Sequence, residues 1–367
     1  MERKNLHPLG AQRRRGPFRA GERVQLTDSK NRKHTITLTT DGYFHSTRLR
    51  IAHSAIIGKP EGTVIATETG HEVQLLRPLL SDYVLSMPRS ATVVYPKDAG
   101  QIIMQADVFP GAQVVEAGLG SGALAMSLLS AIGEHGHLTS VEIRPEFAEV
   151  AQGNVHSWFG TAELPWTVEI GAVADVLYAQ EPHSVDTVIL DMLAPWENIA
   201  PAAQALRPGG VILAYVTTTT QMSRFVEELR RIAAFTEPEA CESFVRSWHL
   251  EGLSVRPDHR MVAHTGFLVV ARRLAPDSKP LRHKLRPAPA AYSEPLAWEE
   301  KAAPISERKL RKVRRDVALR ADQESTGVST PGQHSAELDA KLQDAGAQKA
   351  VQHRQSSADT SQIEEPQ

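Results

Sequence analysis

The feature that most constrains the fold is a series of short apolar segments that alternate with helical patterns between residues 93 and 274. Such alternation is typical of a parallel β-sheet flanked by helices, because each parallel connection needs a crossover. The apolar segments predict five strands, at 113–116, 138–142, 167–170, 187–190 and 211–216. The sequence therefore predicts a doubly wound α/β sheet.

The sequence between these strands predicts helices, because apolar residues recur there at helical spacing. We expect helices at 123–132, 145–159 and 221–234. The residues Arg207-Pro208-Gly209-Gly210 predict a turn before the fifth strand. Two more strands, near 243–249 and 266–271, are expected to close the sheet as an antiparallel pair.

The N-terminal part has a different pattern, with short alternating segments separated by turn residues. Segments 23–27 and 35–39 flank Asp28-Ser29-Lys30-Asn31, which is typical of a β-hairpin. We predict a flexible N-terminus at 1–16, a small β-rich domain at 17–80 and the α/β domain at 81–275.

Bulk composition excludes several classes of protein. The chain has 41 basic and 43 acidic residues, so any affinity for polyanions must come from local clusters. Its single cysteine, Cys241, excludes a disulfide framework and fits a reducing compartment, so we expect a cytoplasmic protein. No secretory signal or membrane-length apolar segment is seen. The histidines lack ligand spacing, so we expect no metal.

The strongest local signal is Val114-Val115-Glu116-Ala117-Gly118-Leu119-Gly120-Ser121-Gly122, which predicts a strand, a glycine turn and then a helix. Taken alone, the turn also satisfies a dinucleotide fingerprint, with Glu142 as the distal acid. Glu116, Glu142 and Asp191 end the first, second and fourth predicted strands. This order resembles that of the class I S-adenosylmethionine-dependent methyltransferases and favours that cofactor over NAD.

The methyltransferase resemblance implies a task for each cofactor residue. The glycines would leave room for the methionine portion, loop amides would bind its carboxylate, and Glu142 would accept the ribose hydroxyls. Phe147 would pack on the adenine or belong to the helix core, and Asp175 would replace Ala172 as acceptor of the adenine amino group. The predicted cofactor residues are Gly118, Leu119, Gly120, Ser121, Gly122, Glu142, Phe147, Asp175 and Asp191.

Four separated motifs resemble the bacterial and archaeal tRNA adenine-58 N1-methyltransferases. They are the glycine loop, the Asp191-x-x-x-Pro195-Trp196 pattern, Tyr95-Pro96-Lys97-Asp98 upstream, and Tyr215 on the fifth strand. The likeness covers about residues 17–274. It implies methyl transfer from S-adenosylmethionine to N1 of adenine 58 in the T-loop of tRNA, a homotetramer, and no membrane.

The resemblance implies three catalytic residues. Asp191 would hold the 6-amino group and offset the positive charge that appears on the methylated ring, although it could instead cap a helix after Pro195. Tyr95 and Tyr215 would stack on or border the flipped adenine, or else belong to the core. Trp196 is expected to pack.

Other classes of protein are also consistent with parts of the sequence. Protein isoaspartate methyltransferases share a similar sheet and cofactor loop, but they do not account for the N-terminal domain. An NAD-dependent oxidoreductase and a noncatalytic RNA-binding protein are the other classes. Residues 276–367 lack the apolar content of a core and are expected to be mostly disordered. Their basic runs, 282–286 and 308–315, form a solvated tail or contact RNA.

Overall fold

The computed structural model describes residues 14–47, 49–67, 70–281 and 306–325. Contacts divide the chain into two units, Met1–His283 and Lys284–Gln367. In the second unit the described part is helix α9 (Glu307–Ser325), which the sequence analysis did not predict. Of the tail that was predicted to be mostly disordered, residues 282–305 and 326–367, which include the basic run 282–286, lie outside the described residues.

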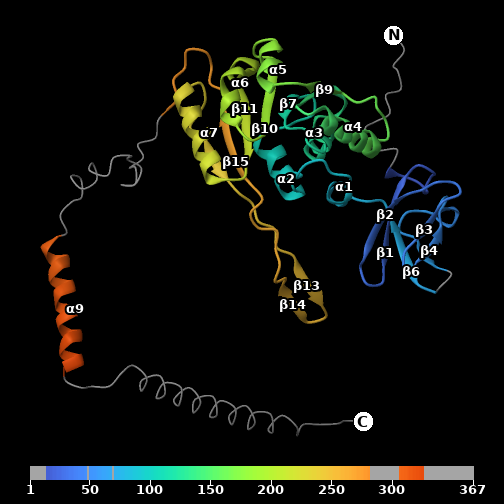
Figure 1. The fold of residues 1–367 in the computed structure, drawn as a ribbon, viewed down its shortest axis with the longest axis horizontal. Helices are drawn as coiled ribbons and strands as arrows, with labels where there is room; N and C mark the ends of the chain where they lie inside the picture. Colours follow the sequence, from blue (N-terminus) through green and yellow to red (C-terminus); the bar gives the residue numbers. More distant parts are fainter. Residues whose placement is uncertain (1–13, 48, 68–69, 282–305, 326–367) are drawn as a thin grey trace, which may run out of the picture. The chain divides into compact units, whose positions relative to one another are not determined.

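The first part of unit 1 is a small antiparallel β domain (Figure 1). One sheet has the order β2-β1-β6-β5, and β3 pairs with β4. The predicted hairpin is confirmed: Arg23 pairs with Thr37, and the turn between β1 and β2 contains Asn31 in a left-handed conformation. The strands are β1 (Arg23–Asp28), β2 (Lys33–Thr37), β3 (Tyr43–His45), β4 (Arg50–Ala52), β5 (Val64–Ala66) and β6 (Glu72–Leu76), with the 3-10 turn η2 (His53–Ala55) after β4.

The second part of unit 1 is a seven-stranded sheet in the order β12-β15-β11-β10-β7-β8-β9. The five predicted strands are present and parallel, and β15 lies antiparallel between β11 and β12. The predicted fold class is therefore confirmed. The strands are β7 (Gln113–Ala117), β8 (His137–Glu142), β9 (Trp166–Ile170), β10 (Val185–Asp191), β11 (Leu206–Val216), β12 (Glu239–Cys241) and β15 (Phe267–Arg272).

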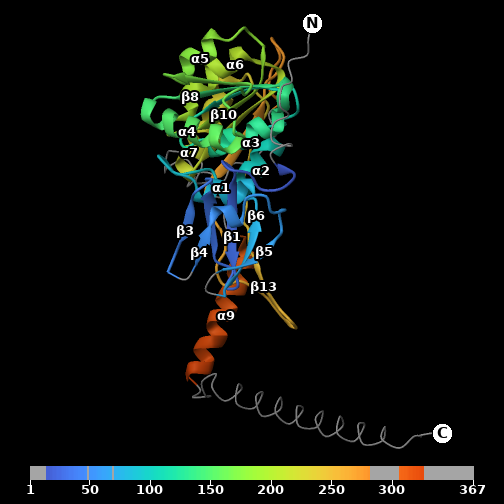
Figure 2. The ribbon, with the colours of Figure 1, turned by 90° about the vertical axis from the view of Figure 1, so that its right-hand side faces the viewer.

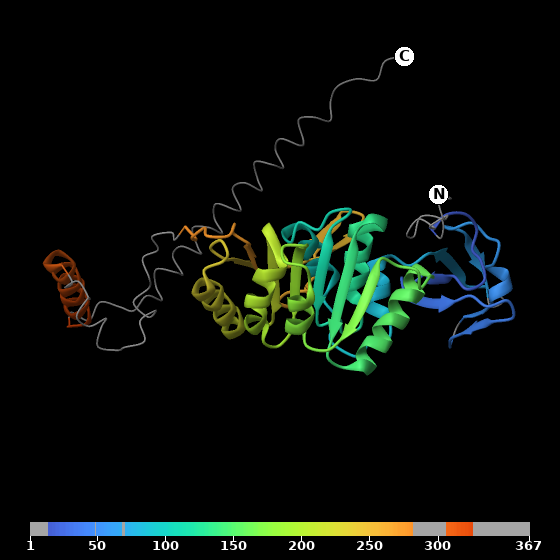
Figure 3. The ribbon, with the colours of Figure 1, turned by 90° about the horizontal axis from the view of Figure 1, so that it is seen from above.

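Helices cover both faces of this sheet (Figure 3). Successive strand residues point to opposite faces, so Val114 of β7 belongs to one buried core and Val115 to the other. The first core packs under α1 (Leu80–Ser86), α2 (Pro96–Gln105), α3 (Ala123–Ile132) and α4 (Pro145–Phe159). The second packs under α5 (Val173–Ala179), α6 (Ile199–Ala205) and α7 (Thr219–Ile232). Short 3-10 turns are η3 (Gly133–His135) and η4 (Pro195–Asn198).

Two sequence predictions about the sheet are wrong. The edge strand expected at 243–249 is β12, which begins at Glu239 and pairs with β15. Residues further on form a separate hairpin, β13 (Trp248–Glu251) with β14 (Ser254–Pro257), which projects from the sheet (Figure 1 and Figure 2). The turn expected at 207–210 is a bulge within β11, because Val185 pairs with Leu206 while Thr187 already pairs with Val211.

Candidate active site

The candidate site forms where β7 and β10 end side by side. Leu190 pairs with Ala117, so the glycine loop after β7 lies against Asp191 at the end of β10. Gly118 has a φ of 67°, and a Cβ there would come 2.1 Å from the Asp191 carbonyl oxygen. Only glycine fits so close to another backbone, which explains the first glycine of the motif. Ligands of open α/β sheets bind at such carboxyl ends.

Glu142, which ends β8, is buried and holds the loop in place. Its Oε2 accepts a hydrogen bond from the Gly120 amide at 3.0 Å. Its Oε1 accepts from the amides of Ile143 and Arg144, both at 3.1 Å, and from Arg144 Nε at 3.3 Å. A carboxylate oxygen has about two acceptor positions, so Oε2 can take one ribose hydroxyl. Oε1 already accepts from the two backbone amides, so both of its positions are filled and Glu142 offers one position instead of the two that were expected.

The loop amides are less available than the sequence analysis expected. Besides Gly120, Leu119 donates its amide to the Val141 carbonyl at 3.3 Å, and Gly122 donates to Leu119 at 2.9 Å. These three amides shape the turn in this structure. The predicted role of loop amides in binding a carboxylate is therefore reduced, although Ser121 still lies at the start of α3.

Asn154 of α4 is a site residue that sequence reasoning missed. Its buried Nδ2 donates to the Ser121 carbonyl at 3.0 Å and to the Pro88 carbonyl at 2.9 Å. The Ser121 hydroxyl in turn accepts from the amides of Ser90 and Ala91 at 3.0 and 3.2 Å. Asn154 thus ties the glycine loop to segment 88–91. One polar residue in a helix gives no sequence signal for such a link.

Two acids beside the loop, the buried Glu116 and the partly buried Asp191, have raised pKa values. Burial raises the pKa of Glu116 to about 8; the Asp191 charge adds to this, while the Ser140 hydroxyl donates to Glu116 and opposes it. Burial, and then the Glu142 charge, raise the pKa of Asp191 to about 7. At neutral pH in the free protein, Glu116 therefore carries a proton and Asp191 titrates.

In the structure Asp191 does not cap a helix, which was the alternative role for this residue. The turn η4 after Pro195 has Ala194 as its N-cap, with no side-chain cap, and α6 begins after Asn198. Asp191 is partly buried at the end of β10, where burial and then the Glu142 charge raise its pKa. Perturbed carboxyl groups of this kind are typical of functional sites.

The two predicted tyrosines differ in their surroundings. Tyr95 is partly buried at the N-terminal end of α2, where its carbonyl accepts from the Asp98 amide at 2.9 Å. Tyr215 pairs with Asp191 in the sheet but is only 7% exposed, and it belongs to the first core. A Cβ on Gly266 would come 2.5 Å from its ring, and burial raises its pKa. Tyr215 thus borders the site from within the core.

The Lys97–Asp98 motif forms a buried polar network. Lys97 Nζ lies 2.6 Å from both Asp98 Oδ1 and the Thr265 hydroxyl. Asp98 also accepts from Thr265 at 2.6 Å and from Ser243 at 3.1 Å. These bonds fix the segment between β12 and β15 against α2. They also hold Gly266 in place, and Gly266 forms the wall against which the Tyr215 ring packs.

The remaining candidates are more exposed than Glu142. Phe147 is partly buried on α4, with the Arg144 guanidinium 3.5 Å from its ring centre. Asp175 is exposed in the first turn of α5. Ile143 was not predicted, yet it is 71% exposed directly after Glu142. It offers an apolar surface for a ligand that Glu142 binds.

Trp196 packs against the second core as expected, with the Arg224 guanidinium 4.0 Å from its ring centre. Within the described ranges, no cluster of three or more His, Cys, Asp or Glu side chains could hold a metal ion. None of the helices in the described part of the chain is long and apolar enough to cross a membrane.

The strand order, the glycine loop after the central strand and the acids that end β8 and β10 define a class I S-adenosylmethionine-dependent methyltransferase fold. Family models agree in detail: residues 16–65 match the TrmI-like N-terminal model, and residues 73–255 match the tRNA methyltransferase complex GCD14 subunit. The chain belongs to the TrmI-type tRNA (adenine-58-N1)-methyltransferase family, as its sequence predicted.

Individual relatives show how far the similarity extends. The chain is 34% identical to the tRNA (adenine(58)-N(1))-methyltransferase TrmI of Thermus thermophilus, covering 68% of this chain and 95% of the relative. It is 34% identical to the adenine-57/adenine-58 enzyme of Methanocaldococcus jannaschii, covering 58% and 82%. The solved TrmI of Aquifex aeolicus superposes with a TM-score of 0.62 at 25% identity, covering 71% of this chain and all of that one.

A second solved structure supports the same fold. A SAM-dependent O-methyltransferase from Thermotoga maritima superposes with a TM-score of 0.66 at 30% identity, covering 71% of this chain and 96% of that one. These similarities include the N-terminal β domain, which isoaspartate methyltransferases and NAD-dependent oxidoreductases do not explain.

Proposed function

We propose that this protein transfers a methyl group from S-adenosylmethionine to N1 of adenine 58 in the T-loop of tRNA. Its relatives in Thermus and Methanocaldococcus carry this activity in their names. The observation that carries the proposal is Asp191, a carboxyl group with a pKa of about 7 beside the glycine loop. A group there can hold an exocyclic amine and respond to charge on the base.

The residues at the site fit S-adenosylmethionine as the cofactor. Gly118 keeps the loop open against β10, and Glu142 has an acceptor position for a ribose hydroxyl. We propose that Ile143 and Phe147 flank the adenine ring and that Asp175 lies at its rim. The cofactor supplies an electrophilic methyl group on a sulfonium. The reaction needs no metal in this proposal.

The reaction depends mainly on the correct positioning of the adenine and the cofactor. The lone pair of adenine N1 forms the new bond to the methyl carbon, and the electrons of the broken C–S bond stay on sulfur. N1 of neutral adenine carries no proton, so no base is needed for this step. Ionised Asp191 holds the 6-amino group and offsets the positive charge left on the ring. Tyr95 and Tyr215 border the base on either side.

We also propose that the protein self-associates, as the family resemblance implies for a homotetramer. The β13–β14 hairpin supports this, because Trp248, Leu250 and Val255 are all exposed on it. Exposed apolar groups on a projecting element are typical of protein interfaces. Sedimentation should show a multimer, and Leu250→Ser should shift it towards monomer. Because tRNA is the proposed substrate, the cytoplasm remains our proposed location.

The test of function uses the full chain, labelled S-adenosylmethionine and unmodified tRNA. Digestion to nucleosides should give 1-methyladenosine, and a tRNA with guanosine at position 58 should accept no label. Prior dialysis against EDTA should leave the rate unchanged. Label in another nucleoside, or retained by the tRNA that lacks adenine 58, would contradict the proposal.

A further inference from the structure

A cavity of about 510 Å³ lies between the β domain and α4. The β domain contributes Arg23 and Arg77 to its lining, the segment before that domain contributes Arg14, and α4 contributes Ser157 and Trp158. Pockets of about 300–1,000 Å³ accommodate small organic groups. None of the residues that line it belongs to the glycine loop or to the strand ends of the active site, so it is a separate site.

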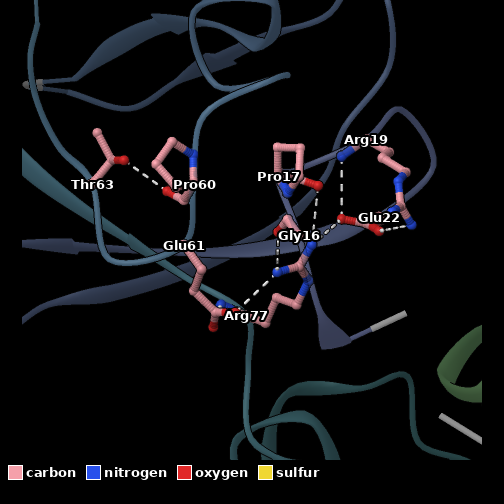
Figure 4. Close-up of polar contacts among 8 residues, drawn as sticks. All are labelled: Gly16, Pro17, Arg19, Glu22, Pro60, Glu61, Thr63 and Arg77. Carbon is pink, nitrogen blue, oxygen red and sulfur yellow. Dashed lines mark hydrogen bonds and ion pairs between the residues drawn. The ribbon is translucent and has the colours of Figure 1, made fainter. Parts of the chain in front are cut away.

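The acids that line the cavity are already neutralised. Arg77 donates to Glu22 Oε2 at 2.8 Å and to Glu61 Oε2 at 2.9 Å, and Arg19 lies 3.7 Å from Glu22 (Figure 4). Arg77 also donates to the carbonyls of Gly16 and Pro17. Two arginines thus balance two carboxylates, and this part of the wall has no net charge to repel an anion.

Two further guanidinium groups in the cavity have no acidic partner among the residues that the structure describes. Arg14 lies 5.2 Å from the Trp158 ring centre. Arg23 lies 4.3 Å from the Tyr83 ring centre and donates to the Ser157 hydroxyl at 2.5 Å. Within the described part of the chain, neither arginine forms an ion pair with a carboxylate. Like charges that line one cavity favour binding of an anion there.

Two stacked aromatic side chains, Tyr83 and Trp158, lie beside these arginines. The rings of Tyr83 and Trp158 stack with centres 5.2 Å apart and planes 17° apart. The Tyr83 hydroxyl donates to the Asn154 carbonyl at 3.1 Å, which fixes α1 on α4. Trp158 lines the cavity and is partly exposed, so it can contact a planar ligand.

We infer that this cavity binds a nucleotide of the tRNA other than the target adenine. Its phosphate would contact Arg14 and Arg23, and its base would lie against Trp158. Guanidinium groups match phosphate geometry, and aromatic rings accept any base. This inference rests on the proposed tRNA substrate. It explains how a chain with a net charge of -2 binds a polyanion through one local cluster.

The test compares charge removal inside and outside the cavity. Arg14→Gln/Arg23→Gln should lower tRNA affinity about 10- to 100-fold at physiological salt and reduce the salt slope of binding by about 1 to 2. The loss should appear in KM for tRNA, with kcat retained. The matched control is Lys30→Gln/Arg50→Gln, which removes from the β domain two charges that form no ion pair among the described residues and do not line the cavity, and it should change affinity less than about 3-fold.

A second variant guards against a folding defect, because Arg23 joins the two domains through Ser157. Arg14 is exposed and has no hydrogen bond to lose among the described residues, so Arg14→Glu should fold normally and weaken tRNA binding more than Arg14→Gln. Equal tRNA affinity of the wild type, the double variant and Arg14→Glu would overturn the inference.

Two further outcomes separate the possible failures. If the protein binds tRNA through these arginines but forms no 1-methyladenosine, the proposed function fails while the cavity assignment stands. If AMP binds the wild type and not the double variant while tRNA affinity is unchanged, the occupant is a free nucleotide and the tRNA assignment is wrong.

Discussion

The active site and the arginine-lined cavity have opposite charge. At the strand ends the acids Glu116, Glu142 and Asp191 gather: the Asp191 charge adds to the raised pKa of Glu116, and the Glu142 charge adds to that of Asp191. In the cavity, Arg14 and Arg23 lack acidic partners within the described residues, and the other charges there are balanced. The acids suit a reaction that ends with a cation on the base, and the arginines suit a phosphate.

This difference shows why net charge is a poor guide to a nucleic-acid enzyme. The two clusters nearly cancel in the sum, yet each acts at the place where it lies. The acidic cluster should control catalysis and cofactor binding, and the basic cluster should control RNA affinity. The following variants test whether these effects separate.

The largest effect is expected from Asp191→Asn, which removes the charge opposite the methylated ring. Methyl transfer should fall by about 100-fold or more, the loss typical of one preorganised electrostatic contact. Asp191 caps no helix, so the melting temperature should stay close to that of the wild type. Single-turnover transfer to tRNA with saturating cofactor measures the rate.

The pH profile gives an independent check on Asp191. Its raised pKa means that the ionised form is lost as pH falls through about 7, so the wild-type rate should rise from pH 6 to 8. Asp191→Asn should abolish this rise. The control Asp107→Asn makes the same chemical change at an exposed turn and should alter neither rate nor profile. A parent-like rate for Asp191→Asn would make Asp191 structural.

The next effect is expected from Glu142→Ala, which acts on the cofactor. Loss of hydrogen bonds to a charged group should weaken S-adenosylmethionine binding by about 1 to 3 kcal/mol. Calorimetry on the free protein measures this, and tRNA affinity should be unaffected. Glu163→Ala, at an exposed loop, is the control. NAD binding in place of S-adenosylmethionine would refute the cofactor assignment.

Asn154→Ala should have a smaller effect on the same ligand. The substitution leaves the Ser121 and Pro88 carbonyls without a donor and loosens the glycine loop. We expect KM for S-adenosylmethionine to rise about 5-fold, with kcat changed less than about 2-fold. The control Thr187→Val loses a buried bond to Ala106 at the other end of β10. It should lower stability similarly and leave KM alone; an equal rise in KM would make Asn154 merely structural.

The acidic cluster could be predicted from the sequence, whereas the arginine cavity could not. Glu116, Glu142 and Asp191 each end a predicted strand, and parallel strands bring their ends to one edge. Arg14, Arg23 and Trp158 come from separate segments with no common motif, and only tertiary packing brings them together. The same holds for Lys97 and Thr265, which are 168 residues apart in the chain.

The wrong strand at 243–249 has a related cause. Its apolar residues predict the face of a strand that is buried in the sheet. In the structure Phe244, Val245 and Trp248 are instead largely exposed, at and before the projecting hairpin. Apolar spacing predicts which residues need covering but not what covers them. Prediction from the sequence of one chain places every apolar face in the core of that same chain.

The smallest effect is expected from removing residues 284–367, which form a separate unit. In the described helix α9, the cations Arg308, Lys309, Arg311 and Lys312 are exposed, so they can contribute a weak, diffuse attraction to RNA. We expect an unchanged melting temperature for unit 1, an unchanged kcat, and tRNA affinity lowered by less than about 3-fold. Filter binding on the truncated and full chains, each with and without Arg14→Glu, measures the two contributions separately. If truncation weakens binding more than Arg14→Glu does, the main phosphate contact lies in the second unit, and the contrast between an acidic active site and a basic cavity would not describe how this protein binds RNA.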